Sequence, residues 1–121
     1  AWFRKNRSRG WATCSATEAG FVRVSSNRLV IPDARLPQEA MALLSRLTEL
    51  PRHVFWTDET RFTTSRHIAA RKLVGYRQVT DSHVLAVALR HDGCLATFDG
   101  GIAEIVPDRV DPSQAIVIIP D

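Results

Sequence analysis

Short apolar segments alternate with helical segments along this chain, and this alternation limits its fold to one class. Apolar, β-branched and aromatic residues mark four strands, at residues 11–14, 53–56, 94–98 and 116–119. Helical patterns fill most of the sequence between them, at about 15–25, 37–50, 65–73 and 81–90. Strands that alternate with helices predict an α/β fold, in which helices cover both faces of one parallel sheet.

Capping residues mark the ends of several of these helices. The segment Ser15-Ala16-Thr17-Glu18 has the S-x-x-E form of a capping box, which predicts that a helix starts here. Pro37 stands at the start of the next long helix, and Asp81 caps the helix at 81–90. The first ten residues have the pattern of a helix end, because basic residues precede Gly10.

No feature of the sequence divides the chain into parts. Its 121 residues are the length of one ordinary domain, and no repeat, low-complexity segment or linker interrupts them. Two cysteines, Cys14 and Cys94, are too few for a disulfide scaffold, so we expect a cytoplasmic protein. The longest apolar run, at 115–119, is too short to span a bilayer, and we expect no membrane association. We therefore predict a single domain over residues 1–121.

Three acidic residues fall where a parallel α/β fold gathers its functional groups, beyond the carboxyl ends of the strands. Glu18 lies in the first turn of the helix after the first strand, Asp81 opens the helix at 81–90, and Asp99 directly follows the strand at 94–98. Carboxylates without a Cys or His ligand pattern suit a hard cation such as Mg²⁺ or Mn²⁺. Such a cation can bind phosphate oxygens and activate water. We expect raised pKa values in this cluster when no cation is bound.

Each of these carboxylates also has a purely structural explanation. Glu18 completes a capping box, Asp81 caps a helix, and Asp99 begins an Asp-Gly turn. Taken singly, each structural explanation is the better one. The three together form a pattern that helix capping does not predict.

Three segments resemble successive signatures of the PIN-domain family, in that family's order and approximate spacing. They read A-T-E-A-G around Glu18, V-T-D-S-H-V-L-A-V-A around Asp81, and G-C-L-A-T-F-D up to Asp99. The end of the chain is similar to the VapC toxin subgroup. The resemblance implies a metal-dependent endoribonuclease with Mg²⁺ or Mn²⁺. Glu18, Asp81 and Asp99 match the second, third and fourth acidic ligands, and Thr97 matches a hydroxyl that supports the cluster.

The resemblance also implies partners and one departure. It implies an RNA substrate, a VapB-like antitoxin and a homodimer. The family's first acidic residue is an Asp at the end of a first strand, but no Asp or Glu precedes Glu18 here. We therefore expect an N-terminally incomplete PIN-like fold, active at full length and weak or inactive as this fragment. The alternative is a non-catalytic PIN-like module that docks an antitoxin or RNA.

Basic residues are weaker candidates for RNA contact. Arginine accounts for all but two of the 16 basic residues, and the net charge of +3 mildly favours a nucleic-acid partner. Arg23, Arg28 and His83 are candidate RNA-binding residues, although a solvated or packed role is the more common one. A phosphoacceptor receiver domain has a similar length, but it needs a lysine after a late strand. This chain has lysine only at positions 5 and 72.

Overall fold

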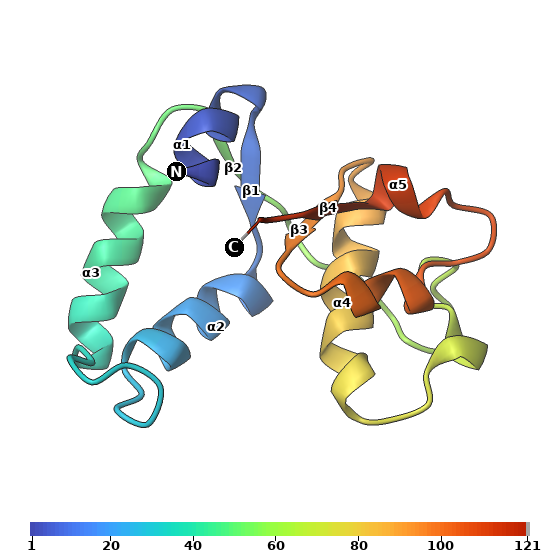
Figure 1. Ribbon diagram of the computed structural model, residues 1–121, viewed down its shortest axis with the longest axis horizontal. Coiled ribbons are helices and arrows are strands. Elements are labelled where there is room, and N and C mark those ends of the chain that lie inside the picture. The colour runs from blue at the N-terminus through green and yellow to red at the C-terminus, as the bar shows by residue number, and fades with distance from the viewer. Residues whose placement is uncertain (121) are drawn as a thin grey trace. The chain divides into compact units, whose positions relative to one another are not determined.

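The computed structural model describes residues 1–120 of the chain, and these form two compact units. The first unit runs from Ala1 to Thr57, and the second begins at Asp58. Figure 1 shows that each unit combines helices with a pair of strands. Both pairs are parallel, so the α/β class predicted from the alternating pattern is confirmed.

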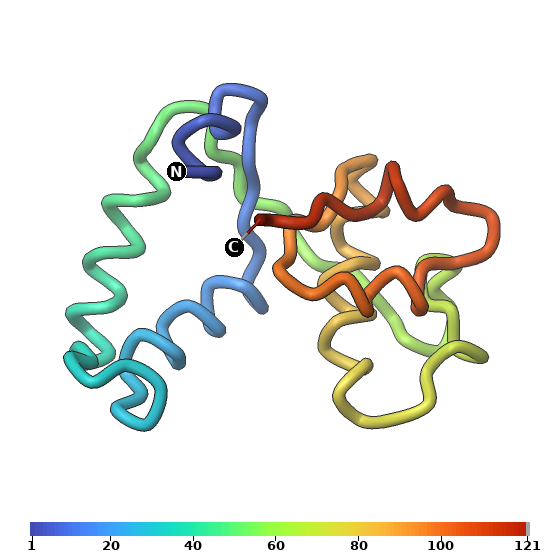
Figure 2. The backbone as a smooth tube through the Cα atoms, viewed as in Figure 1, coloured from blue at the N-terminus to red at the C-terminus, as the bar shows by residue number. Residues whose placement is uncertain are grey.

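In the first unit, two helices connect two strands that pair with each other. Its elements are α1 (Trp2–Asn6), the 3₁₀ helix η1 (Arg7–Arg9), β1 (Trp11–Thr13), α2 (Ser15–Ser25), α3 (Pro37–Thr48) and β2 (His53–Phe55). Figure 2 shows the long loop that joins α2 to α3, and these two helices pack on each other. In the strand pair, Trp11 lies opposite His53 and Thr13 lies opposite Phe55. The connection between β1 and β2 therefore consists mainly of α2 and α3.

Local chemistry explains where β1 begins and where α2 begins. Gly10 has a φ of 95°, a left-handed conformation that glycine adopts without strain, and it ends the helical turns as predicted. The predicted capping box at Ser15 is wrong by one residue, because Cys14 is the N-cap of α2. The backbone N–H of Cys14 donates to the hydroxyl of Thr17 at 2.9 Å. Glu18 is thereby left out of the cap.

The second unit is organised around one long helix. Its elements are the 3₁₀ helix η2 (Ala70–Lys72), α4 (Arg77–Arg90), β3 (Leu95–Thr97), the 3₁₀ helix η3 (Gly100–Ile105), α5 (Pro112–Ala115) and β4 (Ile116–Ile118). Leu95 pairs with Ile116 in the parallel ladder. The core joins α4 to the later elements through six buried residues, Leu85, Ile102, Ile105, Val106, Ala115 and Ile116.

Two helix predictions in this unit are wrong. The helix predicted at 65–73 is reduced to turns and η2, and the Ser65 hydroxyl accepts the backbone N–H of His67 at 3.1 Å. Such a local bond competes with helix formation. The helix predicted to begin at Asp81 begins four residues earlier, at Arg77. Gln78 stabilises that earlier start, because its Oε1 accepts the N–H groups of Val74 and Gly75 at 2.6 and 3.2 Å.

The four predicted strands are all present, each shorter than expected by one or two residues. They form two separate pairs, β1 with β2 and β3 with β4, where the sequence predicted one sheet. The single domain stays a prediction. Within residues 1–120, no helix has both the length and the apolar character needed to cross a membrane.

Candidate active site

Asp99 is held in place by its own backbone turn. It follows β3 directly, and its Oδ1 accepts the N–H of Gly101 at 2.8 Å, which caps η3. The hydroxyl of Thr97 accepts the backbone N–H of Asp99 at 3.1 Å. A Cβ atom at Gly101 would lie 3.0 Å from that Oδ1, so glycine permits this close approach. The carboxylate of Asp99 and the predicted supporting hydroxyl of Thr97 therefore belong to one hydrogen-bonded turn at the end of β3.

Asp81 lies near Asp99 and is destabilised in its charged form. It sits in the second turn of α4, half-buried, and not at the helix cap that the sequence predicted. Burial, first, and the negative charge of Asp99, second, raise the pKa of Asp81 above its ordinary value. The expected raised pKa is thus found at one member of the cluster. Two of the three predicted carboxylates lie close enough to interact.

Replacing Asp81 with asparagine is expected to stabilise the metal-free protein at pH 7. The pKa of Asp81 is higher in the folded than in the unfolded protein, so its protonated form adds stability at a pH below the unfolded-state pKa. That contribution is lost as the pH rises through the folded-state pKa. Above that range the charged carboxylate is unfavourable, and Asp81→Asn removes it. Thermal unfolding in EDTA should give a melting temperature a few degrees higher at pH 7 and little difference at pH 3.

A matched control separates this effect from a general change of charge. Asp108 forms an ion pair with Lys72 at 2.7 Å, and the hydrogen bond and charge of Lys72 lower the pKa of Asp108. Asp108→Asn should therefore not raise the melting temperature at pH 7. If Asp81→Asn and Asp108→Asn change it in the same direction, repulsion at Asp81 is not the cause.

Glu18 belongs to a hydrogen-bonded group in the first unit. The Thr13 hydroxyl donates to Glu18 Oε2 at 2.6 Å and lies 2.8 Å from His53 Nε2. The Thr13 hydroxyl has one hydrogen, and it donates that hydrogen to the Glu18 carboxylate. The bond to His53 must therefore run the other way, with Nε2–H of His53 donating to the oxygen of Thr13. Thr13 and His53 were missed by sequence reasoning. Residues two apart on a strand face the same side, but the sequence does not reveal the pairing of Trp11 with His53 that brings His53 beside Thr13.

His83 is oriented by a carboxylate that the sequence analysis did not select. Its Nε2 bonds Oδ2 of Asp58, and its ring lies 5.7 Å from that of Phe62. Burial acts to raise the pKa of Asp58, but hydrogen bonds from the backbone and hydroxyl of Thr60, together with His83, outweigh it and lower the pKa. Asp58 comes soon after β2, much as Asp99 follows β3, and that position was the available signal.

The acidic pair fits part of a metal site. Asp81 and Asp99 offer hard oxygen donors and the mutual repulsion that a divalent cation relieves. Within residues 1–120, no three side chains of His, Cys, Asp or Glu gather closely enough to hold an ion. Glu18 lies in the other unit, so the three-carboxylate site stays a prediction.

Arg23 and Arg28, both exposed at and beyond the end of α2, also remain predictions as RNA contacts.

Parallel strands, intervening helices and a carboxylate pair formed by Asp99 after β3 and Asp81 on α4 are features of an α/β fold of the PIN type. No protein-family model matches the chain. Three proteins of Mycobacterium tuberculosis (strain ATCC 25618 / H37Rv) are similar to it. Ribonuclease VapC39 is 41% identical over 85% of this chain and 74% of its own length. Ribonuclease VapC38 is 42% identical over 89% of this chain and 74% of its own length. Ribonuclease VapC44 is 40% identical over 85% of this chain and 72% of its own length. The chain belongs to the VapC family of PIN-domain ribonucleases.

Proposed function

We propose that this protein, at full length, is a toxin–antitoxin endoribonuclease that hydrolyses RNA phosphodiester bonds with Mg²⁺ or Mn²⁺. The proximity of Asp81 and Asp99 carries the proposal, because two carboxylates that repel each other favour a bound cation. The relatives named ribonuclease support RNA as the substrate. When bound, a divalent cation neutralises phosphate charge and activates water. In this proposal Asp81 and Asp99 are its ligands, and Glu18 completes the site or positions the attacking water.

The residues around each carboxylate suit these roles. The N–H of Gly101 holds Oδ1 of Asp99, and Thr97 holds its backbone, so this ligand needs little reorganisation to bind. Asp81 projects from a helix whose middle is buried, which keeps its position fixed. On Glu18, the Thr13 hydroxyl occupies Oε2, and the carboxylate can accept a further hydrogen bond from water through Oε1. His83, held by Asp58, is proposed to contact the RNA, together with Arg23 and Arg28.

The proposed partners follow from the family. VapC toxins are expected to pair with a VapB-like antitoxin, and we extend this to the present protein. We also propose a homodimer in the cytoplasm. Light scattering at tens of micromolar protein tests the dimer, and a strict monomer would contradict it. None of these three proposals is needed for the chemistry at Asp81 and Asp99.

An RNA cleavage assay with chelation tests the proposed activity. The full-length protein is incubated with a mixed single-stranded RNA in Mn²⁺, in Mg²⁺ and in EDTA. We expect cleavage with either cation and none in EDTA, with activity restored when excess Mn²⁺ is added back. Cleavage that persists in EDTA would overturn the metal-dependent mechanism. Protein that binds RNA or antitoxin but never cuts would instead be the non-catalytic module.

Thr13→Val is expected to slow cleavage about tenfold, the effect of losing one hydrogen bond to a charged group. The substitution keeps the shape of the side chain but leaves Glu18 and His53 without their shared partner. The rate at saturating RNA, measured for Thr13→Val and Thr13→Ser, checks this. Thr13→Ser retains the hydroxyl and should cut at nearly the parent rate. Equal losses in both variants would point to packing at Thr13 and not to the orientation of Glu18.

A further inference from the structure

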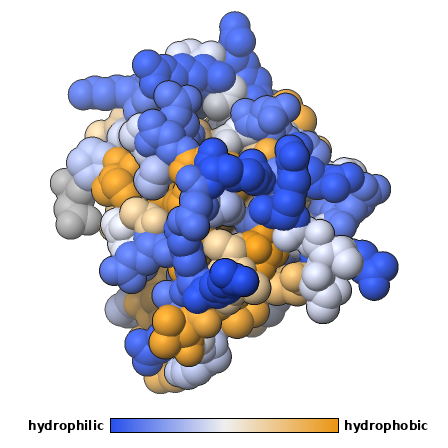
Figure 3. All heavy atoms as spheres, turned by 90° about the vertical axis from the view of Figure 1, so that its right-hand side faces the viewer, coloured by the Kyte–Doolittle hydropathy of each residue, from blue (hydrophilic) through white to orange (hydrophobic). Residues whose placement is uncertain are grey.

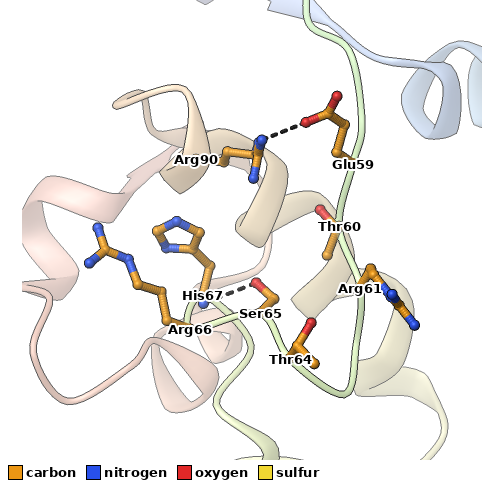
Figure 4. A pocket seen from close by; sticks show the side chains of 8 residues that line it. All are labelled: Glu59, Thr60, Arg61, Thr64, Ser65, Arg66, His67 and Arg90. Carbon is orange, nitrogen blue, oxygen red and sulfur yellow. Dashed lines mark hydrogen bonds and ion pairs between the residues drawn. The ribbon is translucent and has the colours of Figure 1, made fainter.

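A polar pocket in the second unit lies apart from the acidic pair. Its volume is about 350 Å³, and its walls come from residues 59–61, residues 64–67 and Arg90 at the end of α4. Asp81 and Arg90 are nine positions apart on α4, which corresponds to about 13 Å along the helix axis. Figure 4 shows Arg66, His67 and Arg90 on one side of this pocket, with Ser65 and Thr64 beside them. The pocket therefore lies near the end of α4, apart from the acidic pair of Asp81 and Asp99.

Positive charge concentrates around His67. Burial comes first among the causes that lower the pKa of His67, followed by the charges of Arg109, Arg66 and Arg90. Asp92 opposes them but does not reverse the direction. A neutral imidazole surrounded by three guanidinium groups indicates a local field that favours an anion.

Hydrogen bonding makes His67 a donor toward such an anion. Nη2 of Arg109 lies 2.7 Å from Nδ1 of His67. Arginine has no acceptor, so Nδ1 must accept this bond and the proton of the neutral ring must sit on Nε2. His67 therefore offers an N–H group, and Arg66 and Arg90 offer guanidinium donors. The hydroxyls of Thr64 and Ser65 also line the pocket.

Glu59 is the carboxylate among the lining residues, and it is committed to Arg90. Its Oε2 accepts from Nη2 of Arg90 at 2.5 Å, in a pair whose side chains are both largely exposed. Exposed ion pairs contribute little to stability, so this pair can open without harm to the fold. Figure 3 shows hydrophilic side chains over much of the face drawn there, with hydrophobic patches between them.

We propose that this pocket binds a backbone phosphate of the RNA, away from the bond that is cut. This inference rests on the proposed ribonuclease function, since it assumes RNA as the ligand. Arginine forks match phosphate oxygens in two-point contacts, and phosphate contacts position a nucleic acid without reading its sequence. A few nucleotides of single-stranded RNA span the separation between Asp81 and Arg90. The pocket therefore anchors the strand that the acidic pair cuts.

RNA binding in EDTA, where no metal-dependent cleavage occurs, tests the pocket by itself. Fluorescence anisotropy with a labelled single-stranded RNA is measured across a salt series for Arg66→Gln/Arg90→Gln. Arg35→Gln/Arg46→Gln, two exposed arginines of the first unit, is the control with the same change of charge. We expect severalfold weaker binding for the pocket variant alone. The negative slope of log K against log salt should also become shallower by about 1.4, because two phosphate contacts are lost.

Two further measurements sharpen the outcome. Glu59→Gln frees Arg90 and should strengthen RNA binding, the opposite of a folding defect. The ring signals of His67, assigned by nuclear magnetic resonance with His67→Gln, should shift when RNA is added. If the pocket variant binds RNA as the control does, the proposal is overturned. If inorganic phosphate moves the His67 signals and RNA does not, the site takes a free phosphate and the assignment to RNA is wrong.

This design separates the pocket from the catalytic proposal. Binding that depends on Arg66 and Arg90, in a protein that cuts no RNA with Mn²⁺, would support the pocket and contradict the ribonuclease. Metal-dependent cleavage by a protein whose RNA binding does not depend on Arg66 or Arg90 would support the ribonuclease and contradict the pocket. Circular dichroism of each variant confirms that it is folded.

Discussion

Asp99→Asn is expected to slow RNA cleavage by about a hundredfold or more, because it removes a charged ligand from the site where transition-state charge is stabilised. The asparagine keeps an oxygen that can accept the N–H of Gly101, so the turn after β3 should persist. The single-turnover cleavage rate with saturating Mn²⁺ is the measurement. Circular dichroism and thermal unfolding establish that the variant is folded.

Glu104→Gln is the matched control for this experiment. It neutralises an exposed carboxylate of η3, five positions from Asp99 and outside the proposed site. It should cut at the parent rate, and Asp81→Asn should fall together with Asp99→Asn. Because Asp81 and Asp99 act on one ion, the double variant should be little slower than either single variant. If Asp99→Asn and Glu104→Gln cut equally fast, Asp99 has no part in the reaction.

Leu85→Ala should destabilise the protein by about 3 kcal/mol, the usual cost of emptying a leucine site in a well-packed core. Leu85 is fully buried and contacts the cluster formed by η3, α5 and β4. The free energy of unfolding in urea, with unchanged m-value, is the measurement. Val74→Ala, at a residue that is 91% exposed, should stay within about 0.5 kcal/mol of the parent. Similar losses at both positions would contradict the assignment of the core to Leu85.

Strands and strand ends were predictable because their signals are local. The β-branched run at 116–119 and the mostly apolar segment at 94–98 each contain a strand in the structure. Asp99 was placed correctly because a strand end followed by Asp-Gly-Gly is a short-range pattern. The expectation that Asp81 and Asp99 lie near each other came from the rule that parallel strands gather functional groups at one edge, and their roles as metal ligands stay predictions. Those parts of the site needed no knowledge of distant contacts.

Other features depend on contacts that a linear pattern does not encode. The hydroxyl of Thr13 binds Glu18 and His53, and the latter lies forty positions away. The link between Asp58 and His83 spans twenty-five positions and joins a loop to α4. The early start of α4 depends on Oε1 of Gln78, which accepts hydrogen bonds from the N–H groups of Val74 and Gly75. The sequence instead favoured a start at Asp81, because aspartate is a common N-cap residue. In each case a specific side chain outweighs a general preference.

The most direct test of the metal-dependent ribonuclease is the position of Mn²⁺ in crystals of the protein, located by anomalous diffraction. We predict a peak bound by carboxylate oxygens of both Asp81 and Asp99, with Glu18 bound to it or joined through a water. Asp99→Asn crystals grown the same way should lose that peak. A manganese ion bound elsewhere, or no ion at Asp81 and Asp99 when the concentration supports full activity, would show that these two carboxylates do not form the metal site.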